Sequence, residues 1–254
     1  MRPLKLFFIT FFSLFVIQHT TAQFDGIYSQ YMNIKHFYNP AAVGEQELMK
    51  MMVAQRLDWI GIKNAPKTTL FTVNTPFSVG KTHHAAGIQF INDIFGIFAN
   101  QQINLQYAYK FQFEYGVLSV GANLGVINLI CYGDSIKMVE SDYHTPANSD
   151  PAIPIGTQTG LGFDLSAGVY FSNATWFAGV SLLHLPGANI RLGDKYDFKI
   201  NRVMTAVGGY NIKLLNPDFQ LKPSLLFYTD LVSWQAQVSL LLDYQDKYNG
   251  GIAY

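Results

Sequence analysis

Apolar and polar residues alternate strictly in the middle of the chain. In residues 103–113 the odd positions are apolar or aromatic and the even positions are polar or small. After a short polar break at residues 114–116, residues 118–126 repeat the pattern. Successive side chains of a strand point to opposite faces. The two segments therefore predict a β-hairpin with one apolar face and one face rich in amides, serine and glycine.

The length and polarity of this hairpin indicate where its apolar face lies. A soluble antiparallel sheet also alternates, with its apolar side buried. Each arm here has about ten residues, the length of a tilted strand that crosses a bilayer. The polar face carries few charges, whereas soluble surfaces carry more lysine and glutamate. The pattern predicts an all-β fold, an antiparallel transmembrane β-barrel of the outer membrane with its apolar face in lipid.

Similar segments recur along the rest of the chain. With the central hairpin they predict roughly eleven strands: residues 48–56, 68–75, 85–92, 103–113, 118–126, 162–171, 175–183, 200–211, 221–229, 235–244 and 250–254. Bacterial single-chain barrels have even numbers of strands. Either the count is wrong by one or the chain lacks its carboxyl end, and the stop within a strand-like run favours a missing end.

The connections differ in length between the two ends of the predicted strands. Those at residues 114–116 and 172–174 are short, whereas residues 128–160, which are rich in proline, and residues 184–198 form long loops. Residues 58–66, 76–84 and 93–99 are also predicted as connections. Outer-membrane barrels have short periplasmic turns and long outer loops. The short connections are therefore predicted to face the periplasm.

The amino terminus has the features of an export signal. Arg2 and Lys5 precede an apolar run at residues 6–17, and small residues at 20–22 form a cleavage site. The run is too short to span a bilayer as a helix. Residues 1–22 are predicted as a signal peptide of an outer-membrane protein, residues 23–47 as a turn-rich periplasmic or luminal segment, and residues 48–254 as the barrel.

Composition narrows the function classes. The chain has 17 basic and 17 acidic residues, and charged residues make up 13% of it, against about 25% in an average soluble protein. Without a basic domain, nucleic-acid binding is not expected. The single cysteine, Cys131, excludes an internal disulfide framework.

The sequence predicts no catalytic residue, cofactor or metal ligand. His83 and His84 are adjacent in a strand, so they point to opposite faces and are poorly placed to share a metal ion. Acidic residues of the long loop lack the spacing of a calcium-binding loop. A hydrolase requires a Ser-His-acid set, and the pair Ser181 and His184 lacks a defined acid.

Two groups of residues are candidates for other roles. The first group lies in turn-rich segments and predicts either a partner contact or a rigid loop: Asn39, Pro40, Trp59, Gly61, Lys63 and Pro66. The second group lies near strand ends and predicts an aromatic girdle at the membrane interface: Tyr107, Tyr109, Trp176 and Tyr244.

Several motifs also carry a family resemblance. They are Gln30-Tyr31-Met32 with Tyr38-Asn39-Pro40-Ala41, the run at residues 59–69 (Trp-Ile-Gly-Ile-Lys-Asn-Ala-Pro-Lys-Thr-Thr), and the runs at residues 163–171 and 178–185. Through these motifs the chain resembles the PorP/SprF family of type IX secretion and gliding-motility membrane proteins of Bacteroidetes. The family continues past residues 250–254, which agrees with a missing carboxyl end.

The resemblance implies an outer-membrane component of the type IX apparatus, without catalytic residues. Its implied partners are outer-membrane lipid, periplasmic ring and peptidoglycan-linked subunits, and a secreted adhesin. A passive porin or small-solute transporter remains the alternative, since a lumen of glutamine, asparagine and lysine permits one.

Overall fold

The computed structural model describes residues 26, 28–133, 156–193, 196–245 and 247–254. The predicted signal peptide and most of the long loop lie outside these residues. The described residues form fourteen strands: β1 (Lys50–Leu57), β2 (Lys67–Val79), β3 (Thr82–Phe95), β4 (Phe98–Phe113), β5 (Gly116–Tyr132), β6 (Thr157–Ser172), β7 (Trp176–Leu183), β8 (Asn189–Leu192), β9 (Tyr196–Lys199), β10 (Val203–Tyr210), β11 (Ile212–Lys213), β12 (Phe219–Thr229), β13 (Trp234–Tyr244) and β14 (Tyr248–Ala253).

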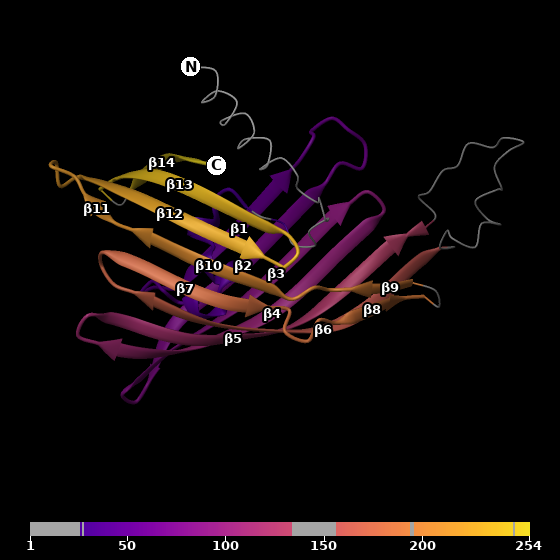
Figure 1. Cartoon of the computed structure of the whole chain (residues 1–254), viewed down its shortest axis with the longest axis horizontal. Helices are drawn as coiled ribbons and strands as arrows, with labels where there is room; N and C mark the ends of the chain where they lie inside the picture. Colours follow the sequence, from indigo (N-terminus) through magenta and orange to yellow (C-terminus); the bar gives the residue numbers. More distant parts are fainter. Residues whose placement is uncertain (1–25, 27, 134–155, 194–195, 246) are drawn as a thin grey trace, which may run out of the picture.

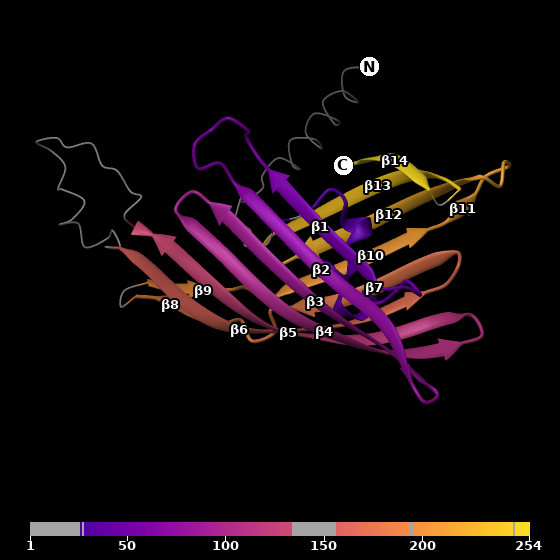
Figure 2. The ribbon, with the colours of Figure 1, turned by 180° about the vertical axis from the view of Figure 1, so that it is seen from behind.

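The main sheet is antiparallel and has the order β1-β2-β3-β4-β5-β6-β7-β10-β12-β13-β14, with β11 paired to β12. Figures 1 and 2 show that this sheet curls around the segment preceding β1. The all-β antiparallel prediction is confirmed. The sheet is open, however, between β1 and β14. Because direction alternates along the eleven strands of this path, the two edge strands run the same way.

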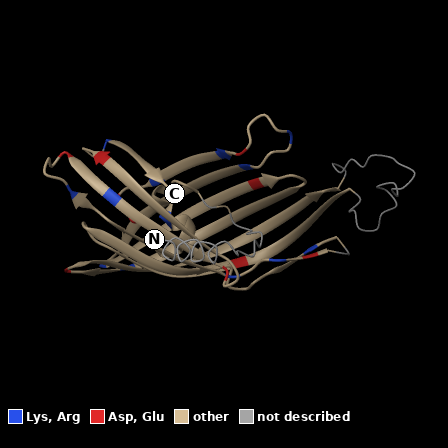
Figure 3. Ribbon diagram, turned by 45° about the horizontal axis from the view of Figure 1, so that its top comes forward, with Lys and Arg blue, Asp and Glu red and all other residues tan. Residues whose placement is uncertain are grey.

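Side chains alternate across the sheet as the sequence predicts. In β4, Asn104 and Gln106 are buried on the concave face, whereas Ile103, Leu105 and Tyr107 are exposed on the convex face. The strands carry long uncharged stretches (Figure 3). This polarity is the reverse of a soluble sheet around an apolar core.

All eleven predicted strands are present, but several boundaries were wrong. Residues 76–84 were predicted as a turn, yet β2 continues through Pro76 and β3 begins at Thr82. β1 flanks β2 only as far as the Lys50–Asn74 pair, so a residue without an N–H is tolerated beyond it. Similarly, β3 and β4 extend into the predicted connection at residues 93–99.

The predicted loop at residues 184–198 contains a second sheet. β8 and β9 pair as a short antiparallel hairpin. Ile190 and Leu192 of β8 pack with Leu129 and Cys131 of β5 in a buried cluster. The loop prediction was wrong because four residues in each arm are too few to show a clear alternation.

Between residue 28 and β1 the structure has three short helical turns: η1 (Tyr31–Asn33), α2 (Lys35–Tyr38) and η2 (Pro40–Ala42). Within the described part of the chain, none of the helices has the length and apolarity needed to cross a membrane.

Candidate functional site

Residues 28–45 form a luminal segment that packs against the concave face of the sheet. Tyr31, Ile34, Tyr38 and Ala41 of this segment are fully buried, and they share one apolar cluster with wall residues such as Leu226. The segment lies inside the curve in both views of the ribbon (Figures 1 and 2). The amino-terminal segment is therefore part of the interior of the sheet.

One side of the wall, formed by β6, β7, β10, β12 and β13, clamps the segment with hydrogen bonds. The hydroxyls of Ser181 and Thr205 donate to the Tyr38 carbonyl at 2.5 and 2.8 Å. The Tyr31 hydroxyl is hydrogen-bonded to Ser224 Oγ at 2.9 Å and to Ser239 Oγ at 3.2 Å. We call these five strands the clamped side.

The motif Asn39-Pro40 is central to this contact. Asn39 is fully buried, and its Nδ2 donates to the carbonyls of Val169 in β6 and Val180 in β7, at 3.0 and 3.2 Å. Its Oδ1 accepts the Ala41 N–H at 2.9 Å, which caps η2. Asn39 and Pro40 therefore lie inside the curved sheet, where Asn39 joins the luminal segment to β6 and β7.

A glycine of β5 allows this close fit. A Cβ on Gly121 would lie 2.5 Å from Ala41 Cα and 2.6 Å from Ala41 N, closer than side-chain atoms approach backbone. Gly121 therefore permits the backbone of η2 to touch the sheet. The alternating pattern alone gives glycine an inward position without showing what fills the space.

The other side of the wall, formed by β2 to β5, faces the segment with amides. Gln106 Nε2 donates to the His36 carbonyl at 2.8 Å. By contrast, several polar side-chain atoms buried here have no partner among the described residues: Thr72 Oγ1, Asn74 Nδ2, Asn104 Oδ1, Gln106 Oε1 and Asn123 Oδ1. We call these four strands the amide side.

His36 of α2 adjoins the amide side. Its ring is buried, and its Nε2 has no hydrogen-bond partner among the described residues. Burial, followed by the positive charge of Lys50, lowers the pKa of His36 to about 4, against the opposing charge of Glu45. The imidazole is therefore neutral at physiological pH.

An ion pair holds the exit of the segment toward β1. Lys35 Nζ lies 2.8 Å from Glu45 Oε1 and 3.7 Å from the centre of the Phe177 ring. The Tyr170 hydroxyl donates to the same Glu45 oxygen at 2.5 Å. Lys110 donates to the Gly44 carbonyl. These contacts fix the point where the segment leaves the interior.

The convex face carries an apolar band of membrane dimensions. Along β4 the outward apolar positions run from Ile103 to Phe113. At about 3.4 Å per residue and a tilt of 35–45°, this run rises about 25 Å along the membrane normal. An outward row of amides, Asn92, Gln101 and Asn128, follows on the far side of Ile103. The band therefore has the height expected of a lipid-facing belt.

The four predicted girdle residues all lie toward the end of the sheet with the short connections at residues 80–81, 114–115 and 173–175, called the turn end. Their rings contact other aromatic rings. The Tyr109 ring meets the His84 ring edge-on, with 5.1 Å between the ring centres. The ring centres of Trp176 and Phe171 are 4.8 Å apart, and those of Tyr244 and Phe219 are 4.9 Å apart. His84 is also hydrogen-bonded to Tyr107. Their role as a membrane girdle stays a prediction.

The opposite end, called the loop end, carries the connections at residues 58–66, 133–156 and 184–202. In the first of these, Trp59, Gly61 and Lys63 are exposed, while Pro66 at the base lines a cavity. The Asp58 N–H donates to the Pro66 carbonyl at 3.1 Å and closes the loop. Whether Trp59, Gly61 and Lys63 contact a partner stays a prediction.

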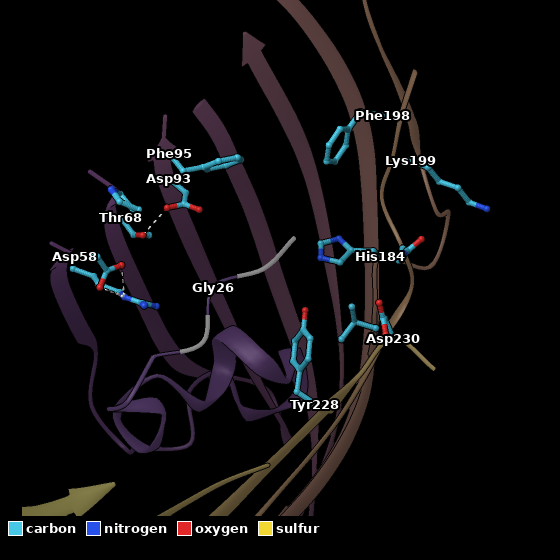
Figure 4. Close-up of a pocket in the computed structure, with 14 residues that line it drawn as sticks. Gly26, Asp58, Thr68, Asp93, Phe95, His184, Phe198, Lys199, Tyr228 and Asp230 are labelled. Carbon is cyan, nitrogen blue, oxygen red and sulfur yellow. Dashed lines mark hydrogen bonds and ion pairs between the residues drawn. The ribbon is translucent and has the colours of Figure 1, made fainter. Parts of the chain in front are cut away.

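The cavity at the loop end has a volume of about 380 Å³. Figure 4 shows Asp58, Thr68 and Asp93 on one side of it and His184, Tyr228 and Asp230 on the other. The Thr68 hydroxyl donates to Asp93 Oδ1 at 2.6 Å. The cavity therefore combines carboxylates with aromatic side chains.

The structure supplies the acid that the sequence did not assign to His184. Asp164 Oδ1 of β6 lies 2.9 Å from His184 Nδ1, and both side chains are buried. The Ser181 hydroxyl donates instead to the Tyr38 carbonyl. The suspected Ser181–His184 pair is therefore not formed. The sequence does show an acidic residue, Asp164, at an inward position of β6. That it meets His184, which directly follows β7, depends on how the two strands pair in the fold.

Comparison with known proteins identifies the family. A sequence profile described as "Type IX secretion system membrane protein PorP/SprF" matches residues 20–254. The chain belongs to the PorP/SprF family. This PorP/SprF protein is thus a membrane protein of the type IX secretion system, and the resemblance drawn from its motifs is confirmed. No curated protein matches the chain.

Among solved structures, the crystal structure of the beta domain of the Bordetella autotransporter BrkA is similar to this PorP/SprF protein. The two are 15% identical, with a TM-score of 0.32, and the match covers 81% of this chain and 87% of that one.

Proposed function

We propose that this PorP/SprF protein is an outer-membrane scaffold of the type IX apparatus. It docks periplasmic ring and peptidoglycan-linked subunits and supports the secretion or surface attachment of specific adhesins. Family membership supports the apparatus. The observation that favours a scaffold over a pore is the luminal segment, which is bonded to both sides of the wall.

The apparatus role is tested by deleting the gene and following adhesin at the cell surface with antibody. We expect the surface adhesin signal to be lost and then restored by the wild-type gene, while uptake of small dyes stays unchanged. Normal surface display in the deletion strain would reject this role.

The alternative is a passive porin, which the uncharged amide side favours. Bilayer conductance of the purified protein separates the two functions. A scaffold whose interior is occupied by its own segment conducts poorly, whereas a porin gives stable open channels in every preparation. Membrane fractionation and the mass of the mature amino terminus test the outer-membrane location and the cleavage after residue 22.

A further inference from the structure

Two exposed apolar tips stand beside the cavity at the loop end. The first, in the β1–β2 loop, has Trp59, Ile60 and Ile62, which are 70%, 84% and 64% exposed. The second, in the β12–β13 turn, has Leu231 and Val232, which are 84% and 69% exposed. We call residues 58–66 and 230–233 together the rim. Clustered exposed apolar side chains are typical of interaction sites.

Both tips are held in place by hydrogen bonds within their own turns. In the first, the Ile62 N–H donates to the Trp59 carbonyl at 3.1 Å. In the second, Asp230 Oδ1 accepts the N–H groups of Val232 and Ser233 at 3.1 and 2.7 Å. Trp59 has φ of 50° and Leu231 has φ of 69°. A left-handed conformation is unfavourable for these residues, so both turns keep strained apolar residues at the surface.

The tips stand apart from the strands that carry the outward apolar band. On the outward face, the amides Asn92, Gln101 and Asn128 form one row on the loop-end side of Ile103. Through Thr69, the same row reaches Gln55 in β1. Trp59, Ile60 and Ile62 follow Gln55 in sequence and lie beyond the end of β1. The Leu231–Val232 tip likewise lies between β12 and β13, so both tips belong to connections at the loop end.

The cavity between the tips is acidic on its inner side. Its lining includes the carboxylates of Asp58, Asp93 and Asp230. Arg56 pairs with Asp58 at 3.0 Å, and Figure 4 shows the Lys199 side chain pointing away from the cavity. Partial burial raises the pKa of Asp230, but the hydrogen bonds from Ser233 and Val232 outweigh it and lower the pKa overall. Asp230 is therefore ionised at neutral pH.

We infer that the rim and its cavity are a docking site for an extended polypeptide segment that carries a lysine or arginine between apolar residues. The apolar side chains pack on the two tips, and the cationic side chain enters the cavity toward Asp93 and Asp230. Charge complementarity with the carboxylates of the cavity favours this occupant over lipid. The inference rests on the proposed scaffold function and names the chemistry of one partner.

A synthetic peptide probes this site directly. An eight-residue peptide with two leucines on each side of a central lysine is labelled with a fluorophore, beside a matched peptide with glutamate in place of lysine. Binding to the folded protein in nonionic detergent is followed by fluorescence anisotropy at low salt. We expect the lysine peptide to bind about tenfold more tightly than the glutamate peptide. Equal binding, or none, would overturn the inference.

Variants separate the charge of the cavity from the apolar tips. Asp93→Asn with Asp230→Asn keeps the hydrogen-bond acceptors and is expected to remove the preference for lysine. Leu231→Ser with Val232→Ser is expected to weaken both peptides about tenfold. The matched control, Leu214→Ser with Leu215→Ser, changes an exposed apolar pair at the turn end and should leave binding unchanged.

Folding is checked for every variant by heat-dependent migration in gels. An equal loss of binding in the control and the rim variants would show that the peptide binds apolar surface without selection, and would reject the site. The proposed function fails separately: normal adhesin display in the deletion strain rejects the apparatus role whatever the peptide result.

Discussion

The clamped side and the amide side hold the same segment in different ways. On the clamped side, Ser181 donates to the Tyr38 carbonyl of the segment, and the Val169 carbonyl accepts a hydrogen bond from Asn39 of the segment. On the amide side, buried atoms such as Asn104 Oδ1 have no partner among the described residues. An unmade buried hydrogen bond costs about 1–3 kcal/mol, whereas a made one contributes about 1 kcal/mol. The clamped side therefore supplies most of the side-chain anchoring, and the partnerless atoms of the amide side tolerate replacement.

The largest effect is expected from pH, through His36 beside the amide side. Its pKa is about 4 in the folded protein and about 6.5 in the unfolded chain, so the unfolded state binds the proton first as pH falls. Stability is thus full above about pH 6.5 and decreases toward pH 4, by about 3 kcal/mol. Urea unfolding followed by tryptophan fluorescence from pH 7 to 4 measures this slope.

His36→Leu removes the titration, so its slope between pH 6.5 and 4 should flatten. An unchanged slope in this variant would assign the pH dependence of stability to other groups. It would then not reflect the burial of His36 beside the amide side.

A matched pair of glycines in β5 gives the next effect. A Cβ at Gly121 would lie 2.5 Å from the backbone of Ala41, whereas a Cβ at Gly125 would chiefly meet the end of the Asn104 side chain and would lie 3.1 Å from the Ile103 carbonyl oxygen. Gly121→Ala should therefore cost about 2 kcal/mol by overpacking, and Gly125→Ala clearly less. Limited proteolysis of residues 28–45 reports the loosened segment. Equal cleavage of the two variants would contradict the close fit at η2.

A smaller contrast is expected between two asparagines. Asn39→Ala removes a cap and leaves the carbonyls of Val169 and Val180 without that donor, at a cost of about 1–2 kcal/mol. Asn104→Leu removes a buried atom that has no partner and should change stability by less than about 0.5 kcal/mol. Thermal unfolding in detergent compares them, and a larger loss in Asn104→Leu would reverse the assignment of the two sides.

The smallest effect is expected on the convex face, where Trp176 tests the girdle. Trp176→Ala removes an exposed ring at the turn end and should weaken stability in lipid vesicles by about 1 kcal/mol, with a smaller change in detergent. The same loss in both media would assign Trp176 to packing with Phe171.

Strand positions could be predicted from the sequence because alternation is a local property. The exceptions have physical reasons: Pro76 is tolerated where β1 no longer flanks β2, and the arms of β8 and β9 are too short to show a period. The residues of the candidate site were harder to predict from the sequence. Asn39-Pro40 was recognised as a motif, but its place depends on Gly121 and on carbonyls of β6 and β7. The Asp164–His184 pair and the rim depend likewise on pairing between distant strands.

Site-specific labelling tests the central claim most directly, namely that the apolar face meets lipid while the luminal segment fills the interior. Single cysteines at Leu124, Ala41 and Ile60 are introduced with Cys131→Ser and labelled with a fluorophore in vesicles. We predict that brominated lipid quenches the label at 124, that iodide quenches the label at 60, and that the label at 41 is protected from both. The account would be contradicted if iodide quenched the label at 41 as strongly as the label at 60. It would also be contradicted if brominated lipid did not quench the label at 124.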